Sequence, residues 1–285
     1  MMTTLKAYAG GLWRRAGEHD FMFMAGALSF SILVCIVPFV LIVFSIGGLM
    51  FERTAFVQQI NGFIDVVVPY ADTARFLKDI VATQAEEFRE YKTVAGVAGL
   101  IGLFFASSAL FSTIRSMFHQ INPEAGARSL LVGKLHDIGM IALVMLLFLF
   151  AAAVLPAMQI IEHIAENTGY LSGTIVARVK PLIMDSVSGV TLFLILFAIH
   201  LLVPRARTSK SSAFVGACVT TVLWVVASWI FGAYIAHLAN FQKVYGAYVL
   251  GIVVFFWIHY SSMVFIVGAE IGQIFRERRE SKRAP

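Results

Sequence analysis

The sequence has few charged residues for its length. Only 14% of its 285 residues are Asp, Glu, Lys or Arg, whereas 59% are hydrophobic, and the mean hydropathy is +0.82. A soluble domain usually has about a quarter charged residues, so this composition excludes a water-soluble globule. A helix needs roughly 20 apolar residues to cross a bilayer. Six stretches without charged residues reach or approach that length: Phe21–Phe51, Thr93–Ile114, Ile138–Ile161, Ser186–Pro204, Ser211–Gln242 and Val244–Ala269.

These stretches lack the alternation of polar and apolar residues that a membrane β-barrel strand shows over about 10 positions. Ile141–Leu155, for example, is continuously apolar. Backbone groups inside lipid must form their hydrogen bonds within their own segment, which favours helices. We therefore predict an all-α, polytopic membrane protein with six transmembrane helices.

Cysteine and the usual catalytic motifs are also scarce. Cys35 and Cys218 both lie in apolar stretches, and their positions fit neither a disulfide framework nor a metal-binding spacing. None of the seven histidines forms an HxxH or HExxH pattern, and the sequence has no nucleotide-binding fingerprint. We therefore predict no metal, no cofactor and no enzymatic activity.

The distribution of Lys and Arg predicts the orientation, because these residues favour cytoplasmic loops. Six spans place both termini on one side, and assigning that side to the cytoplasm gives it the larger share of Lys and Arg. We therefore predict cytoplasmic N- and C-termini. The basic tail of residues 276–285 and the net charge of +5 favour contact with anionic lipid headgroups and not with nucleic acid. The sequence leaves open whether the protein forms a homo-oligomer.

Two segments outside the spans also have helical patterns. In residues 1–19 apolar side chains recur at helical spacing, with Arg14 and Arg15 on the polar side. This pattern predicts an interfacial amphipathic helix on the cytoplasmic leaflet, and a partner-binding helix is the alternative. The pattern of residues 52–92 predicts a helical extracytoplasmic loop. This loop is either a lid over a pathway or a surface that packs on lipid headgroups. The six-helix transmembrane domain then covers residues 20–275.

Short motifs in four of the stretches resemble a known family in their order and spacing. They are Gly26–Ser31 with Pro38; Phe104–Leu110 with Arg115 and Asn122; Gly216 with Ala217, Trp224, Phe231 and Tyr234; and Tyr245 with Gly246, Trp257 and Gly268–Glu270. Through them the chain resembles the YihY/virulence factor BrkB family over most of its length. The resemblance implies a bacterial inner-membrane protein of six helices, from a family formerly mislabelled ribonuclease BN and linked to serum resistance. It implies no settled activity, although transport has been suggested for the family.

Ionisable groups inside apolar helices are costly and therefore mark candidate sites. His259 and Glu270 are 11 residues apart in the last stretch, about three helical turns, so they share one face. Arg115, on one face of the second stretch with Ser108 and Ser112, has the depth to pair with Glu270. This pair would be either a static bridge between helices or a gate.

The same spans have further polar and small residues. Ser29, Ser31 and Pro38 predict a polar, irregular patch in the first span, because a proline inside a helix frees backbone carbonyls. We interpret His259 either as a hydrogen-bonded interior group or as a proton relay. Members of this family usually have Tyr at the position of His259. The resemblance therefore assigns no role to His259. Small residues favour close helix contacts, at Gly96, Gly99 and Gly102 and at Gly268 and Gly272.

The function that fits these features is movement of a small solute or lipid-like molecule across the bacterial inner membrane. The alternative is a non-transporting protein that scaffolds envelope factors or is associated with serum resistance. An enzyme is the third interpretation, and the ribonuclease interpretation lacks the convergent carboxylates, histidines or metal ligands that hydrolysis needs.

Overall fold

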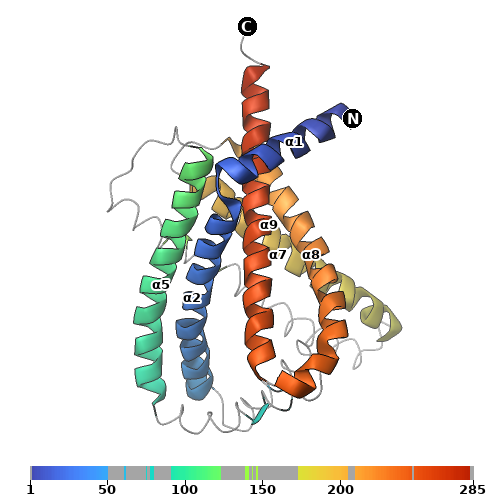
Figure 1. Ribbon diagram of the computed structural model, residues 1–285. Helices are drawn as coiled ribbons and strands as arrows, with labels where there is room; N and C mark the ends of the chain where they lie inside the picture. The colour runs from blue at the N-terminus through green and yellow to red at the C-terminus, as the bar shows by residue number, and fades with distance from the viewer. Residues whose placement is uncertain are drawn as a thin grey trace. The chain divides into compact units, whose positions relative to one another are not determined.

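The computed structural model describes residues 2–50, 91–122, 173–204, 209–245 and 247–282, with a few single positions between them. All secondary structure in these ranges is α-helical (Figure 1). The helices are α1 (Met2–Glu18), α2 (Phe21–Met50), α5 (Lys92–Ile121), α7 (Gly173–Leu202), α8 (Lys210–Tyr245) and α9 (Ala247–Ser281). The predicted all-α fold is therefore confirmed for the described residues.

Four helical segments are long and apolar enough to cross a membrane: Phe21–Ile42, Thr93–Ile121, Lys210–Tyr234 and Gly251–Ser281. They correspond to the first, second, fifth and sixth predicted spans. The fourth predicted span contains a shorter apolar helix, Ser186–Leu202. The third predicted span and the loop of residues 52–92 lie outside the described residues, apart from single positions. The total of six transmembrane spans and the cytoplasmic location of both termini therefore stay predictions.

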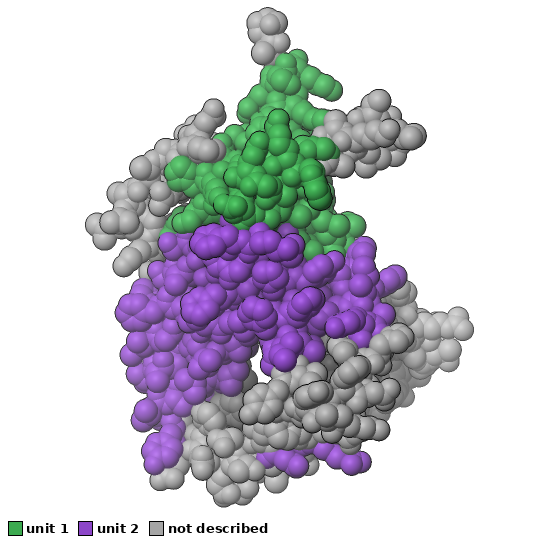
Figure 2. All heavy atoms as spheres, in the orientation of Figure 1, with its two compact units in different colours: residues 1–21, 114–225, 264–285 green, residues 22–113, 226–263 purple. Residues whose placement is uncertain are grey.

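The described helices belong to two compact units (Figure 2). Unit 1 comprises Met1–Phe21, Ile114–Val225 and Val264–Pro285, and unit 2 comprises Met22–Thr113 and Val226–Met263. The boundaries fall at the start of α2 and inside α5, α8 and α9. Most of these helices therefore contribute one part to each unit.

In unit 1, α8 and α9 meet along a seam of small residues. On α8 the seam residues are four apart and are Ser212, Gly216 and Thr220; on α9 they are Gly268 and Gly272. A β-carbon at Gly268 would overlap the Thr220 hydroxyl and lie 2.9 Å from the Gly216 carbonyl oxygen. The Ser212 hydroxyl donates to the Gly272 carbonyl over 2.8 Å. The predicted close contact at Gly268 and Gly272 is confirmed, and α8 is the neighbour.

The buried side chain of His200 joins α7 to this seam. Its ring lies edge-on to Phe118 of α5 and Phe265 of α9, with centroids 5.6 Å and 5.0 Å away. Its Nδ1 donates to the Leu196 carbonyl over 2.8 Å. A β-carbon at Gly216 would lie 2.8 Å from the imidazole. The absence of a side chain at Gly216 therefore leaves the space that this ring occupies.

In unit 2, α2 and α5 pack closely around Pro38. A β-carbon at Gly99 would lie 3.0 Å from the Pro38 carbonyl oxygen, and one at Gly102 would lie 3.1 Å from the proline ring. The α2 helix continues through Pro38 from Phe21 to Met50. Pro38 is therefore part of a tight contact with the glycines of α5, and the predicted irregularity of this patch does not interrupt the helix.

Candidate functional site

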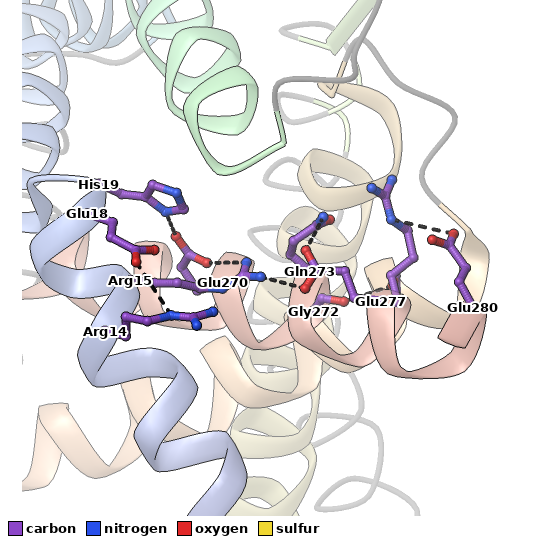
Figure 3. Close-up of polar contacts among 11 residues, drawn as sticks. Arg14, Arg15, Glu18, His19, Glu270, Gly272, Gln273, Glu277 and Glu280 are labelled. Carbon is purple, nitrogen blue, oxygen red and sulfur yellow. Dashed lines mark hydrogen bonds and ion pairs between the residues drawn. The ribbon is translucent and has the colours of Figure 1, made fainter. Parts of the chain in front are cut away.

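The Glu270 carboxylate is fully buried, with 0% of its side chain exposed. One oxygen has its partner on α1 and the other has its partner at the residue directly after α1 (Figure 3). Nη1 of Arg15 donates to Oε2 over 3.1 Å, and Nδ1 of His19 donates to Oε1. The second terminal nitrogen of Arg15, Nη2, lies 2.5 Å from Oε2 of Glu277, which is further towards the end of α9. One guanidinium therefore bridges two carboxylates on the same helix.

The α1 helix presents one stripe of residues to α9 within unit 1. The contacts are Tyr8 with Arg278, Arg15 with Glu277 and Glu270, and, directly after α1, His19 with Glu270; a β-carbon at Gly11 would lie 3.4 Å from Cδ1 of Ile274. The α1 positions follow the three- and four-residue spacing of one helix face. Within unit 1, α1 therefore crosses α9 and contacts it through one face (Figure 1).

The contacts of Arg15 also determine its charge. Its side chain is 11% exposed, and burial alone would lower the pKa of the guanidinium. The hydrogen bonds to Glu277 and Glu270 and the attraction of both carboxylates outweigh burial and raise the pKa of Arg15 above its usual value. A raised pKa stabilises the docked form at every pH below the unfolded-state value and loses that stabilisation only above it. Arg15 therefore stays charged throughout the physiological range.

The expected partner of Glu270 was Arg115, and the structure corrects this expectation. Among the described residues the ion pairs of Glu270 are with Arg15 and His19. Arg115 is half-buried on α5 and has interactions of its own. The expectation was wrong because helical spacing shows which residues share a face, but it does not show which helix lies opposite.

Residues 1–19 were predicted to form an interfacial amphipathic helix; α1 is a helix, and its interfacial position stays a prediction, but the pattern misplaced Arg15. The sequence pattern put Arg15 with Arg14 on the polar side, and only Arg14 is exposed there, paired with Glu18 of the same helix. Trp13, one of the apolar residues in this helical pattern, is 85% exposed. Arg15 and His19 are four residues apart and so lie on one side of the chain. This spacing, together with the need of Glu270 for a counter-ion, is the sequence signal that could have identified them as its partners.

A second polar cluster lies in unit 2 and contains no carboxylate. The Ser29 hydroxyl of α2 lies 3.2 Å from the Ser262 hydroxyl and 3.4 Å from Nδ1 of His259, both on α9. Ser29 and Ser262 are 0% and 1% exposed, and the His259 ring is stacked on Phe255. The structure therefore joins Ser29 and His259, two of the residues singled out from the sequence.

The remaining candidate residues fall into the same unit. The Ser31 hydroxyl lies 2.9 Å from the Thr113 hydroxyl, which links α2 to α5. Ser108 is half-buried and Ser112 is exposed. Glu270 belongs to unit 1 and the other candidates except Arg115 to unit 2, so two separate clusters replace the single predicted one. Among the described residues, no three His, Cys, Asp or Glu side chains converge as a metal site would require.

Comparisons with known proteins agree with the membrane character of these helices. The profile of the family described as "Virulence factor BrkB" matches residues 12–285. A "UPF0761 membrane protein" of Aggregatibacter aphrophilus is 22% identical over 99% of this chain and 96% of its own length. Bacillus subtilis has a "Putative ribonuclease-like protein YfkH" that is 23% identical over 94% of this chain and 95% of its own length.

A longer relative marks the extent of the similarity. A "UPF0761 membrane protein" of Chlorobium luteolum is 26% identical over 93% of this chain, which covers 59% of that protein. No solved structure matches the chain. The profile match extends over almost the whole sequence, including the second part of α1 from residue 12 onward and the Arg15, His19 and Glu270 cluster. The chain is a membrane protein of the virulence factor BrkB family.

Proposed function

We propose that this protein moves a small solute or lipid-like molecule across the bacterial inner membrane. The observation that carries the proposal is the Glu270 carboxylate, fully buried within a helix long and apolar enough to span the membrane. An ionisable group inside a span costs about 2.5–3.5 kcal/mol on insertion scales. Replacing a buried ion pair with apolar residues is often neutral or stabilising. A bundle with a purely structural role therefore has little need of this group.

The origin of its counter-ions also supports transport. Arg15 lies on α1 and His19 directly follows it, and α1 is a separate helix that precedes the first span. A counter-ion on a separate helix can be withdrawn from the carboxylate while the spans remain packed. The Ser29, His259 and Ser262 cluster supplies uncharged hydrogen-bonding groups between helices α2 and α9. A polar solute that leaves water needs such groups to replace its hydration.

The proposal includes the topology predicted from the sequence: six spans with both termini in the cytoplasm. In this orientation α1 and the end of α9 lie on the cytoplasmic side, so the Glu270 cluster is at the cytoplasmic end of its span. The alternative to transport is a non-transporting scaffold for envelope factors. The two functions differ in one measurable way. A transporter changes the distribution of its substrate between cell and medium, whereas a scaffold does not.

The test is untargeted metabolite and lipid profiling of a deletion strain, in cells and in medium. The strain is complemented with the wild-type protein, Glu270→Gln, or Glu280→Gln as the matched control. Glu280 is a carboxylate on the same helix, but it is exposed and pairs with Arg276 one turn away. We expect one class of compound to change in the deletion strain and to be restored by wild type and Glu280→Gln, at equal protein levels, but not by Glu270→Gln. No difference in any class, or full restoration by Glu270→Gln, would refute the proposal.

A further inference from the structure

The connection between α1 and α2 is a short and definite turn. Only His19 and Asp20 separate the two helices. Asp20 has a φ of 48°, in the left-handed region that Asp tolerates better than most residues. The Gln120 side chain of α5 donates to the His19 carbonyl over 3.0 Å. The backbone of the turn is therefore anchored to α5, and α1 precedes it as one continuous helix.

Charge dominates the contact that holds α1 against α9. Its strongest contacts are those of Arg15 with Glu270 and Glu277 and of His19 with Glu270. The other contacts are peripheral, with the Arg278 guanidinium 4.4 Å from the centre of the Tyr8 ring and van der Waals packing at Gly11. The largest apolar side chain described on α1, Trp13, points away and is 85% exposed. Among the α1 side chains that the structure describes, this contact therefore depends on ionisable groups more than on apolar burial.

The opposite face of α9 is held quite differently. The glycine seam with α8 brings backbone against backbone and involves no charge. Withdrawal of α1 would leave this seam intact, but both oxygens of Glu270 would lose their partners. An unpaired buried carboxylate is unfavourable until water, a proton or another cation reaches it. The carboxylate is therefore covered only while α1 is docked.

We propose that α1 is a hinged latch, which turns about Asp20, carries Arg15 and His19 with it, and alternately covers and uncovers the Glu270 carboxylate. The inference rests on the proposed function in one respect, namely that uncovering Glu270 is a step of transport. The docking of α1 is a physical property that can be measured without any substrate. Arg15 and His19 are positioning residues, because they act through α1 and its contact with Glu270.

The first test is amide hydrogen exchange on the full-length protein in lipid nanodiscs. Arg15→Gln removes the bridge between the two carboxylates, and Arg14→Gln is the matched control, because Arg14 pairs only within α1 among the described residues. We expect Arg15→Gln to speed exchange in residues 8–19 by about tenfold or more while α8 and α9 along the seam stay unchanged. Arg14→Gln should leave both segments unchanged. Equal exchange in Arg15→Gln and wild type, or a parallel increase in the seam, would overturn the latch.

The second test separates the latch from the transport proposal. Gly11→Cys and Ile274→Cys, in a chain whose native cysteines are replaced by alanine, place two thiols across the contact. A short thiol cross-linker then fixes α1 in the docked position. We expect the cross-linked protein to give the metabolite profile of the deletion strain, and a cleavable linker to restore the wild-type profile after reduction. A wild-type profile with the linker in place would remove the gating role, and this result is distinct from finding no substrate class at all.

Discussion

The two parts of α9 pack in different ways. From residue 251 to 263, in unit 2, most side chains are exposed or half-buried, and the polar contacts are uncharged hydrogen bonds to α2. From 264 onward, in unit 1, most side chains up to 275 are buried, with a glycine seam on one face and Glu270 on another. The first part has the exposed apolar surface that suits contact with lipid. The second part has protein on both sides.

This difference shows how an ionisable residue is accommodated in an apolar helix. His259, in the more exposed part, has one long hydrogen bond and a stacked neighbour. Glu270, in the buried part, has a partner for each oxygen. A carboxylate that is removed from water needs charged or strongly donating partners, whereas an imidazole can remain neutral. The contributions of His259 and Glu270 to stability therefore need separate tests, although both residues lie on α9.

The largest effect is expected where backbone meets backbone. Gly268→Val would place a side chain against Thr220 and the Gly216 carbonyl, and overpacking of this kind should lower the free energy of unfolding by about 3 kcal/mol. Unfolding by SDS in mixed micelles measures it. Gly251→Val is the control in the other part of α9, since a β-carbon at Gly251 would meet nothing within 4 Å. Equal losses for both variants would contradict the contrast between the two parts.

A smaller effect is expected for the contact between α1 and α9. In a double-mutant cycle, Arg15→Gln and Glu270→Gln should show a coupling of about 2 kcal/mol, because each single change leaves a buried partner unpaired. Amide exchange in α1 gives the opening free energies for the cycle. The same cycle with Arg115→Gln and Glu270→Gln should show less than about 0.5 kcal/mol. A larger coupling for Arg115 than for Arg15 would restore the pairing first expected from the sequence.

The smallest effect is expected in the uncharged cluster. Ser29→Ala removes the hydroxyl near Ser262 and His259, and hydrogen bonds between membrane helices contribute about 0.6 kcal/mol on average. Ser112→Ala, an exposed position on α5, should change stability by less than that. SDS unfolding of both variants checks the prediction. A loss above about 2 kcal/mol for Ser29→Ala would mean that this cluster is as tightly coupled as the charged one.

Much of the fold could be predicted from the sequence because membrane spans have a strong signal. Uncharged stretches identified the spans in α2, α5, α8 and α9. Glycine spacing identified the close contacts at Gly99, Gly102, Gly268 and Gly272. Both signals are local, since each depends on residues within a few turns of one helix.

The partner of Glu270 could not be predicted for the same reason. The cost of burying its carboxylate shows that a partner is needed, but Arg15 is 255 residues away in the sequence. Periodicity in α1 suggested a solvent-facing arginine, because charged residues on short amphipathic helices usually face water. A buried guanidinium between two carboxylates has the same sequence pattern as an exposed one. Its tertiary contacts alone distinguish the two cases.

The contact between α1 and α9 also has a consequence for biosynthesis. Its three hydrogen bonds join residues separated by 251, 255 and 262 positions. The ribosome completes α1 first and α9 last, so every other described helix is synthesised before the partner of Arg15 and His19 exists. Long-range contacts of this kind form late, because the intervening chain must first be ordered. Neutralisation of Glu270 thus requires α1 and α9 to be synthesised and brought together, and a chain released before residue 270 has no means of making this contact.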